Sequence, residues 1–123
     1  MLREFQKDAL SVRVCEDAIA LGCTAAADIA DGIRTCLAEK PEIRMIFAAA
    51  PSQNETLAAL LADPSIPWER IHAFHMDEYV GLSEDAPQGF ANFLKAALFD
   101  HVPFASVNLL RSTAEPEADR RAE

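Results

Sequence analysis

The sequence predicts an α/β fold, built on an open, mainly parallel sheet with flanking helices. Two apolar runs, residues 45–50 and 71–76, have the length of strands but lack the alternation of a strand with one wet face. Each run is followed along the chain by a segment with the apolar spacing of a helix. Strands that alternate with helices form parallel sheets with right-handed crossovers, so these observations together indicate the fold class.

The first half of the chain is predicted to contain a strand, a long helix and a second strand. Residues 10–14 alternate apolar and polar, as a short half-exposed strand does. Asp17 is expected to cap a helix that runs to about Ala38, and residues 45–50 form the second strand, covered on both faces. The apolar stripe of the helix is Ile19, Ala26, Ala30, Ile33 and Leu37.

The second half continues the alternation within the same single domain, residues 1–123. The expected order is a turn at 51–54, a short helix at 55–62, a buried strand at 71–76, a polar loop at 83–88, a helix at 89–100 and a strand at 107–110. Residues 111–123 are polar and charged without apolar periodicity, and we expect a connection or tail there.

Composition excludes several classes of partner. The chain of 123 residues has 20 acidic and 11 basic side chains, a formal net charge of -9, which argues against nucleic acid and against an anionic membrane surface. No apolar run has the length of a membrane span, and the first residues lack a signal-peptide pattern, so we expect a soluble cytoplasmic protein. The sequence does not decide whether it is a homo-oligomer.

Metal and redox chemistry have little support. Cys15, Cys23 and Cys36 are too widely spaced for a Cys-x-x-Cys site and are interpreted as reduced thiols. On a strand, His75 shares a side with Asp77, while His72 faces the opposite side. Two ligands on one side are too few for a defined metal site. We therefore predict no metal.

Two segments follow buried strands, where open parallel sheets bind their ligands. The first contains Ala49, Ala50, Ser52, Gln53 and Asn54. The backbone N–H groups of the helix that follows carry partial positive charge, so this segment is a candidate anion site. The residues alone favour a simpler alternative, a turn in which Ser52 or Asn54 caps that helix.

The second segment is Asp77, Glu78 and Tyr79, directly after the strand at 71–76. Carboxylates at the mouth of a sheet are suited to proton transfer. Successive side chains of extended backbone point opposite ways, so only one of the two carboxylates can face a given pocket. From the residues alone, a capping or salt-bridging role for Asp77 is equally open.

The string Met-Asp-Glu-Tyr-Val-Gly-Leu at residues 76–82 resembles the glucosamine-6-phosphate deaminase/isomerase family, which is related to the 6-phosphogluconolactonases. The aromatic helix with Phe90 and Phe93, the run Phe-Asp-His-Val at 99–102 and the strand at 107–110 also match. The resemblance covers nearly the whole chain and about the N-terminal half of a family member, with a Rossmann-like fold.

The resemblance implies a site and a reaction. Asp77 matches the acid/base carboxylate that moves a proton between C1 and C2 of an open-chain amino-sugar phosphate, after which ammonia leaves C2. The segment from Ala49 to Asn54 matches the phosphate-binding position, with Glu78 and Tyr79 beside the substrate. No metal and no organic cofactor is implied, and a sugar phosphate is the implied partner.

Two departures from the family pattern shape the expectation. A Gly-Gly-Thr-Pro-like phosphate loop is replaced by Ala-Ala-Pro-Ser-Gln-Asn at 49–54, so Ser52 and Gln53 are expected to bind phosphate instead. The family's downstream ring-opening histidine lies beyond the matched part, so this chain alone is expected to be a weak or inactive enzyme. A non-catalytic sugar-phosphate-binding module and a 6-phosphogluconolactonase-like hydrolase remain the alternatives.

Overall fold

The computed structural model describes residues 2–111, and their elements follow the predicted order with one addition at the N-terminus. The strands are β1 (Arg3–Lys7), β2 (Leu10–Val14), β3 (Ile43–Phe47), β4 (Ile71–His75) and β5 (Ser106–Asn108). The helices are α1 (Ala18–Glu39), α2 (Asn54–Ala62) and α3 (Phe90–Leu94), which continues as a π-helical stretch, Lys95–Phe99; Pro51–Gln53 and Trp68–Arg70 are single 3₁₀ turns. Of the expected tail at 111–123, all but Arg111 lies outside the described residues.

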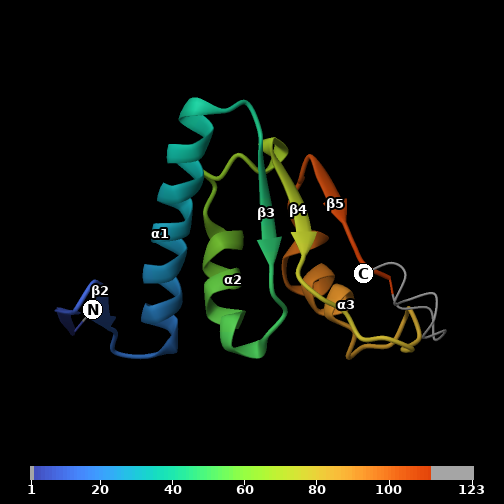
Figure 1. Cartoon of the computed structure of the whole chain (residues 1–123), viewed down its shortest axis with the longest axis horizontal. Coiled ribbons are helices and arrows are strands. Elements are labelled where there is room, and N and C mark those ends of the chain that lie inside the picture. The colour runs from blue at the N-terminus through green and yellow to red at the C-terminus, as the bar shows by residue number, and fades with distance from the viewer. Residues whose placement is uncertain (1, 112–123) are drawn as a thin grey trace.

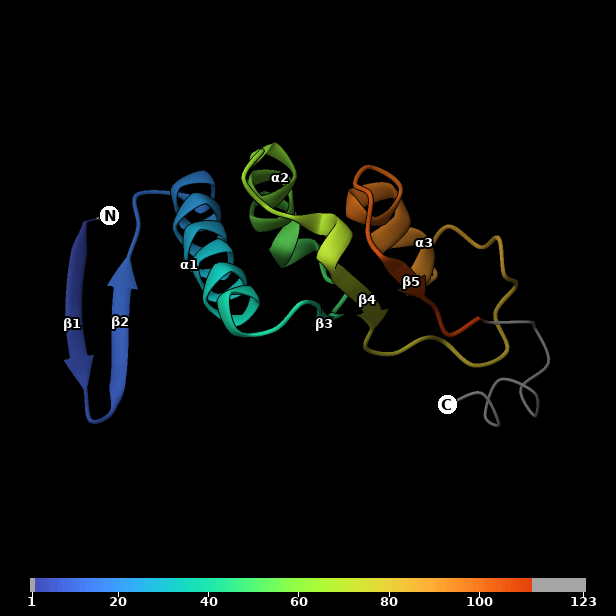
Figure 2. The same cartoon turned by 90° about the horizontal axis from the view of Figure 1, so that it is seen from above.

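Three parallel strands form the main sheet, in the order β3-β4-β5. Ile43 pairs with Ile71, and His72 pairs with Ser106, so the three strands start nearly level with one another. Figures 1 and 2 show α1, α2 and α3 side by side along one face of this sheet. The predicted α/β class with a parallel sheet is confirmed.

The core lies between this sheet face and the helices, and it corrects one expectation. Phe47 of β3 and Ile71 and Ala73 of β4 are buried against the helices. Ile46, the neighbour of Phe47 on β3, points to the other face of the sheet and is 70% exposed. Within residues 2–111 the sheet is therefore covered on one face, not both. Strand bounds shift as well: β3 starts at Ile43 and ends at Phe47, rather than running over 45–50.

Helix α1 begins as the sequence predicts but packs differently. The Asp17 carboxylate accepts a hydrogen bond from the Ala20 N–H at 2.8 Å, which confirms the cap. Ile19, expected on the buried stripe, is 70% exposed, and Gly22 is buried instead. A Cβ at Gly22 would lie 2.6 Å from the carbonyl carbon of Glu55, so the absent side chain lets α1 approach the backbone of α2.

The strand β1 was not expected from the sequence. It pairs antiparallel with β2, with Lys7 opposite Leu10, and Asp8 takes a positive φ of 54° in the tight turn between them. Nearly every residue of the hairpin is exposed, so no buried apolar face marks β1 in the sequence. In Figure 2 the hairpin lies beside α1, on the side away from the main sheet, and the Arg13 guanidinium pairs with Asp28 of that helix.

Candidate active site

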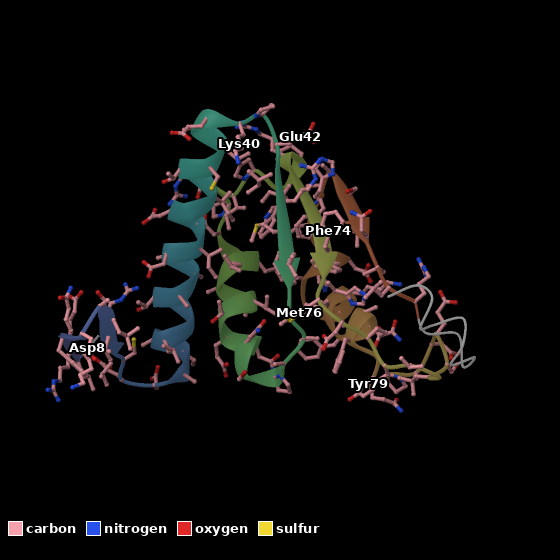
Figure 3. The ribbon with its side chains drawn as sticks, viewed as in Figure 1. Asp8, Lys40, Glu42, Phe74, Met76 and Tyr79 are labelled. Carbon is pink, nitrogen blue, oxygen red and sulfur yellow. The ribbon has the colours of Figure 1, made fainter. Side chains whose placement is uncertain are left out.

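Two chain segments leave the main sheet side by side at the carboxyl ends of β3 and β4. Phe47 pairs with His75, and the next amide, Met76 N–H, donates to the Phe47 carbonyl at 2.9 Å. Ala49 and Asp77 each lie two residues beyond this last pair of the sheet. Figure 3 shows Met76 and Tyr79 toward this end of the sheet and Glu42 at the other end. The structure thus brings together the two segments that the sequence singled out.

The segment from Ala49 to Asn54 contains a 3₁₀ turn that leads directly into α2. Gln53 N–H donates to the Ala50 carbonyl at 3.0 Å, and Asn54 N–H donates to the Pro51 carbonyl. Neither the turn nor α2 has a side-chain cap, so the simpler alternative, a helix capped by Ser52 or Asn54, is not what forms. Ser52 and Asn54 are exposed and Gln53 is half-buried. No side chain caps the start of α2, which makes it a candidate position for an anion.

The start of α2 is held in place by close helix packing. Glu55, in its first turn, lies against Gly22 of α1. The backbones are so close there that no room remains for a Cβ atom on residue 22. Leu57 and Leu60 anchor the buried side of α2 in the core. Backbone and core contacts therefore fix the position of this helix terminus.

Asp77 and Glu78 have different surroundings. The Asp77 side chain is exposed, and among residues 2–111 it has no hydrogen bond or ion pair. The Glu78 carboxylate instead accepts from the amides of Phe90 at 2.8 Å and Ala91 at 2.9 Å, at the start of α3, and from its neighbour Tyr79 at 3.0 Å. Glu78 thus caps a helix from twelve residues upstream, which leaves Asp77 as the free carboxylate.

Tyr79 packs toward the same helix. Its ring lies 4.6 Å from that of Phe90, centroid to centroid, and it remains partly exposed. The structure therefore joins Glu78 and Tyr79 to α3, whereas the Asp77 side chain is exposed. A substrate role for Glu78 and Tyr79 stays a prediction.

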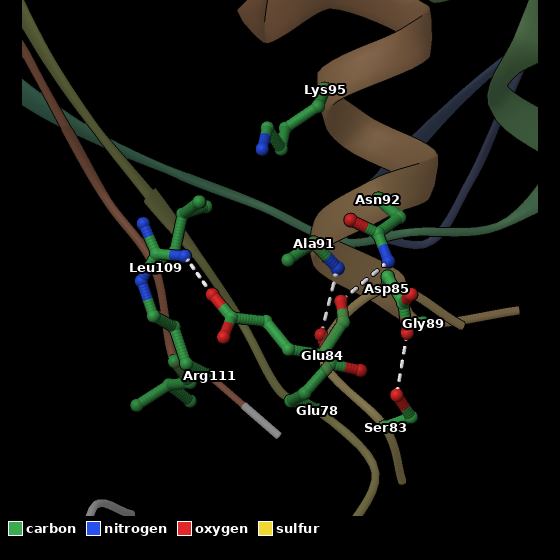
Figure 4. Close-up of a pocket in the computed structure, with 11 residues that line it drawn as sticks. Glu78, Ser83, Glu84, Asp85, Gly89, Ala91, Asn92, Lys95, Leu109 and Arg111 are labelled. Carbon is green, nitrogen blue, oxygen red and sulfur yellow. Dashed lines mark hydrogen bonds and ion pairs between the residues drawn. The ribbon is translucent and has the colours of Figure 1, made fainter. Parts of the chain in front are cut away.

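A cavity of about 390 Å³ lies next to this edge, between α3, the loop before it and the end of β5. Figure 4 shows Lys95 and Asn92 on the helix, Asp85 next to Asn92, and Glu84 reaching toward Arg111 on the other side. Glu84 pairs with Arg111, and Asp85 accepts from Ser83 at 2.5 Å. Sequence reasoning missed these residues because none belongs to a motif. Asp77 does not line this cavity.

His75 is a structural residue beneath the candidate site. Its side chain is 6% exposed, and its Nε2 accepts the Leu110 N–H at 2.6 Å, which fixes the neutral tautomer with the proton on Nδ1. It thereby ties the end of β4 to the segment after β5. Among residues 2–111, no three His, Cys, Asp or Glu side chains gather in a way that could hold a metal ion.

The chain is similar to glucosamine-6-phosphate deaminases in both sequence and structure. The chain is 37% identical over 65 residues to a glucosamine-6-phosphate deaminase of Yersinia enterocolitica, covering 51% of the chain and 24% of the relative. It is 40% identical over 50 residues to a deaminase of the same name from an Exiguobacterium species, covering 40% of the chain and 20% of that relative. A solved monomeric glucosamine-6-phosphate deaminase superposes with a TM-score of 0.69 at 25% identity, over 89% of this chain and 46% of that one.

The chain matches part of a glucosamine-6-phosphate deaminase. It spans about a quarter of the length of the curated relatives it matches and about half of the solved structure. No family model matches it. Solved 6-phosphogluconolactonases from Shewanella baltica and Thermotoga maritima superpose with TM-scores of 0.74 and 0.71, at 16% and 23% identity. The lactonase likeness shows a shared fold, whereas the deaminase likeness extends to sequence. In the part of the chain that the structure describes, no helix is long and apolar enough to cross a membrane.

Proposed function

We propose that the edge formed by Asp77 and the Ala49–Asn54 segment is the sugar-phosphate site of a glucosamine-6-phosphate deaminase-like enzyme. The observation that carries the proposal is that a free carboxylate and a helix start without a side-chain cap follow the carboxyl ends of two neighbouring parallel strands. The similarity in sequence to proteins named glucosamine-6-phosphate deaminase supplies the substrate class.

The phosphate is assigned to the start of α2. Its first-turn amides lack side-chain caps, and the side chains of Ser52 and Gln53 add donors next to them. This arrangement substitutes polar side chains for the close backbone approach that glycines would permit. Each hydrogen bond to a charged phosphate oxygen is worth about 1.5–3 kcal/mol, or roughly 10- to 100-fold in affinity.

Asp77 is assigned the proton transfer. As the base, its carboxylate takes the proton from C2 of the open-chain aldose form, and as the acid it returns that proton to C1. As C2 loses its proton, the electrons of the C2–H bond form a C1–C2 double bond, and the aldehyde oxygen becomes a hydroxyl with a proton from the C2 ammonium group. Protonation of C1 then leaves an iminium at C2. Water adds to C2, ammonia leaves, and a ketone remains. A positioned general base of this kind contributes about 10²–10⁴-fold to rate. Ring opening of the closed sugar requires a further acid/base group, which we assign to the portion of the relatives that this chain does not match.

The test measures binding and turnover separately. Glucosamine-6-phosphate is titrated calorimetrically, and ammonia is followed with a coupled assay. The Ser52→Ala/Gln53→Ala double variant is expected to weaken binding at least tenfold, with Ser11→Ala as a control on the exposed hairpin. Unchanged affinity in the double variant would remove the phosphate assignment.

Asp77→Asn addresses the chemistry. In a protein that turns over the substrate, this variant is expected to abolish ammonia release while the melting temperature and the affinity change little. Glu84→Gln, a surface carboxylate paired with Arg111, is the matched control. Loss of stability with retained turnover would show that Asp77 is structural. Saturable binding with no turnover by this chain, abolished in the double variant, would instead favour a sugar-phosphate-binding module.

A further inference from the structure

A second polar constellation lies at the opposite end of the strands, on the face of the sheet that carries no helix. His72 Nδ1 lies 2.7 Å from the Ser106 hydroxyl oxygen, and His72 Nε2 pairs with the Glu42 carboxylate. Glu42 precedes β3, as Figure 3 shows, His72 is on β4, and Ser106 begins β5. Asp77 lies five positions after His72, roughly 16 Å along an extended chain at about 3.3 Å per residue, so this constellation is not part of the candidate active site.

Asn108 and Glu42 together constrain the direction of the hydrogen bonds in this constellation. Its side-chain amide lies 3.2 Å from the Ala73 carbonyl, which can only accept, so the group facing that carbonyl is the NH₂. The same NH₂ donates to the Ser106 hydroxyl oxygen at 3.0 Å. The Glu42 carboxylate only accepts, so His72 Nε2–H donates to it. In the neutral imidazole Nδ1 is then the acceptor, and the Ser106 hydroxyl donates to it.

We propose that Ser106, His72 and Glu42 form a nucleophilic triad that reacts with small activated carboxylic esters. Nucleophile, base and orienting carboxylate are hydrogen-bonded in sequence, and such triads are recognised by geometry and not by their order in the chain. Ser106 is half-buried, and the side chains of His72 and Glu42 are 26% and 55% exposed, so a small ester reaches the hydroxyl.

The reaction balances without a cofactor. The Ser106 oxygen attacks the ester carbonyl carbon and its proton moves to His72 Nδ1, while Glu42 holds the resulting imidazolium through Nε2–H. The carbonyl re-forms, the alkoxide leaves with the proton from His72, and water then releases the acid by the same steps. Arg44 pairs with His72 in the β3–β4 register and so rises from the same face, where it is the candidate to stabilise the oxyanion.

A fluorophosphonate probe tests the nucleophile in the unchanged protein. Ser106 displaces fluoride from phosphorus, its proton goes to His72, and the adduct is mapped by peptide mass spectrometry. Ser83 is the internal control, because its hydroxyl is hydrogen-bonded to a carboxylate, that of Asp85, but to no imidazole. We expect Ser106 to be labelled at least 100-fold faster than Ser83. Equal labelling of the two serines would overturn the proposal.

Variants separate a reactive triad from a strand clamp. His72→Gln retains an acceptor for the hydroxyl but takes no proton, and it is expected to lower both labelling and 4-nitrophenyl acetate hydrolysis about 100-fold. Glu42→Ala should lower them less, and Glu42→Asp should restore part of the loss, since Glu42 is a positioning residue. Variants that lower the melting temperature and leave the labelling of Ser106 unchanged would show that the constellation only joins strands.

Discussion

Replacing Gly22 by alanine tests the packing that presents the start of α2. The added Cβ would lie 2.6 Å from the carbonyl carbon of Glu55, and ordinary contact begins at 3.4 Å, so the two helices must separate by 0.8 Å. Overpacking costs about 1–3 kcal/mol, and a clash with backbone belongs in the upper part of that range. Alanine returns about 1 kcal/mol of helix propensity, which leaves a net loss of about 1–2 kcal/mol.

Gly32 provides the matched control on the same helix. Nothing lies within 4 Å of a Cβ placed at Gly32, so Gly32→Ala causes no clash. The higher helix propensity of alanine is then expected to stabilise the fold by about 1 kcal/mol. Urea denaturation measures the free energy of unfolding of both variants, and each kcal/mol corresponds to about 4 °C in melting temperature for a chain of this length. If Gly22→Ala is as stable as Gly32→Ala, the close approach of α1 to α2 is refuted. If it is destabilised, its affinity for glucosamine-6-phosphate should also fall, because the α2 terminus has moved.

Two further predictions concern carboxylates outside the proposed chemistry. Glu78→Ala removes the acceptor of the first α3 amides and is expected to cost about 1–2 kcal/mol in urea denaturation, whereas Glu84→Ala, a loss of one surface ion pair, should cost under about 1 kcal/mol. Hydrogen bonds from the Ser65 hydroxyl and amide hold the pKa of Asp63 below its ordinary value of 3.8. A lowered folded-state pKa stabilises the fold above the unfolded value and is lost as pH falls through the folded value. The stability difference between the unchanged protein and Asp63→Ala should therefore be constant above about pH 5 and shrink below pH 4, as thermal melts at several pH values would show; a difference that grows on acidification would contradict this.

The alternation of strands and helices could be predicted from the sequence because it depends on local patterns. Asp17 followed by an apolar period is sufficient to place the start of α1, and the apolar run at 71–75 is sufficient to place β4. Periodicity failed at Ile19 and Gly22, because counting apolar side chains does not detect a glycine used for close backbone approach. It also missed β1, whose exposed residues have no face to bury.

The site was predictable in position but not in its division of roles. Strand ends place Asp77 and the Ala49–Asn54 segment at one edge, which a parallel register requires. The absence of a side-chain cap on α2 depends on the 3₁₀ turn that precedes it, and turn geometry is not encoded in residue type alone. The triad at the other end joins residues 30 and 34 positions apart, so only the register of the sheet reveals it.

The adjacent carboxylates Asp77 and Glu78 show how the fold assigns one residue to structure and frees its neighbour for chemistry. The Glu78 carboxylate turns to the α3 amides, whereas the Asp77 side chain is exposed and accepts from none of them. α3 begins at Phe90 without a side-chain cap of its own, and the Glu78 carboxylate supplies it from across the loop. These hydrogen bonds also hold the segment that follows β4 against α3. The position of Asp77 therefore depends on the contact that its neighbour Glu78 makes. Exchanging the pair, with Glu at 77 and Asp at 78, would shorten the cap by one methylene and lengthen the base by one. Both functions should then fail together, with lower stability and lower turnover, although the charge and composition of the chain are unchanged.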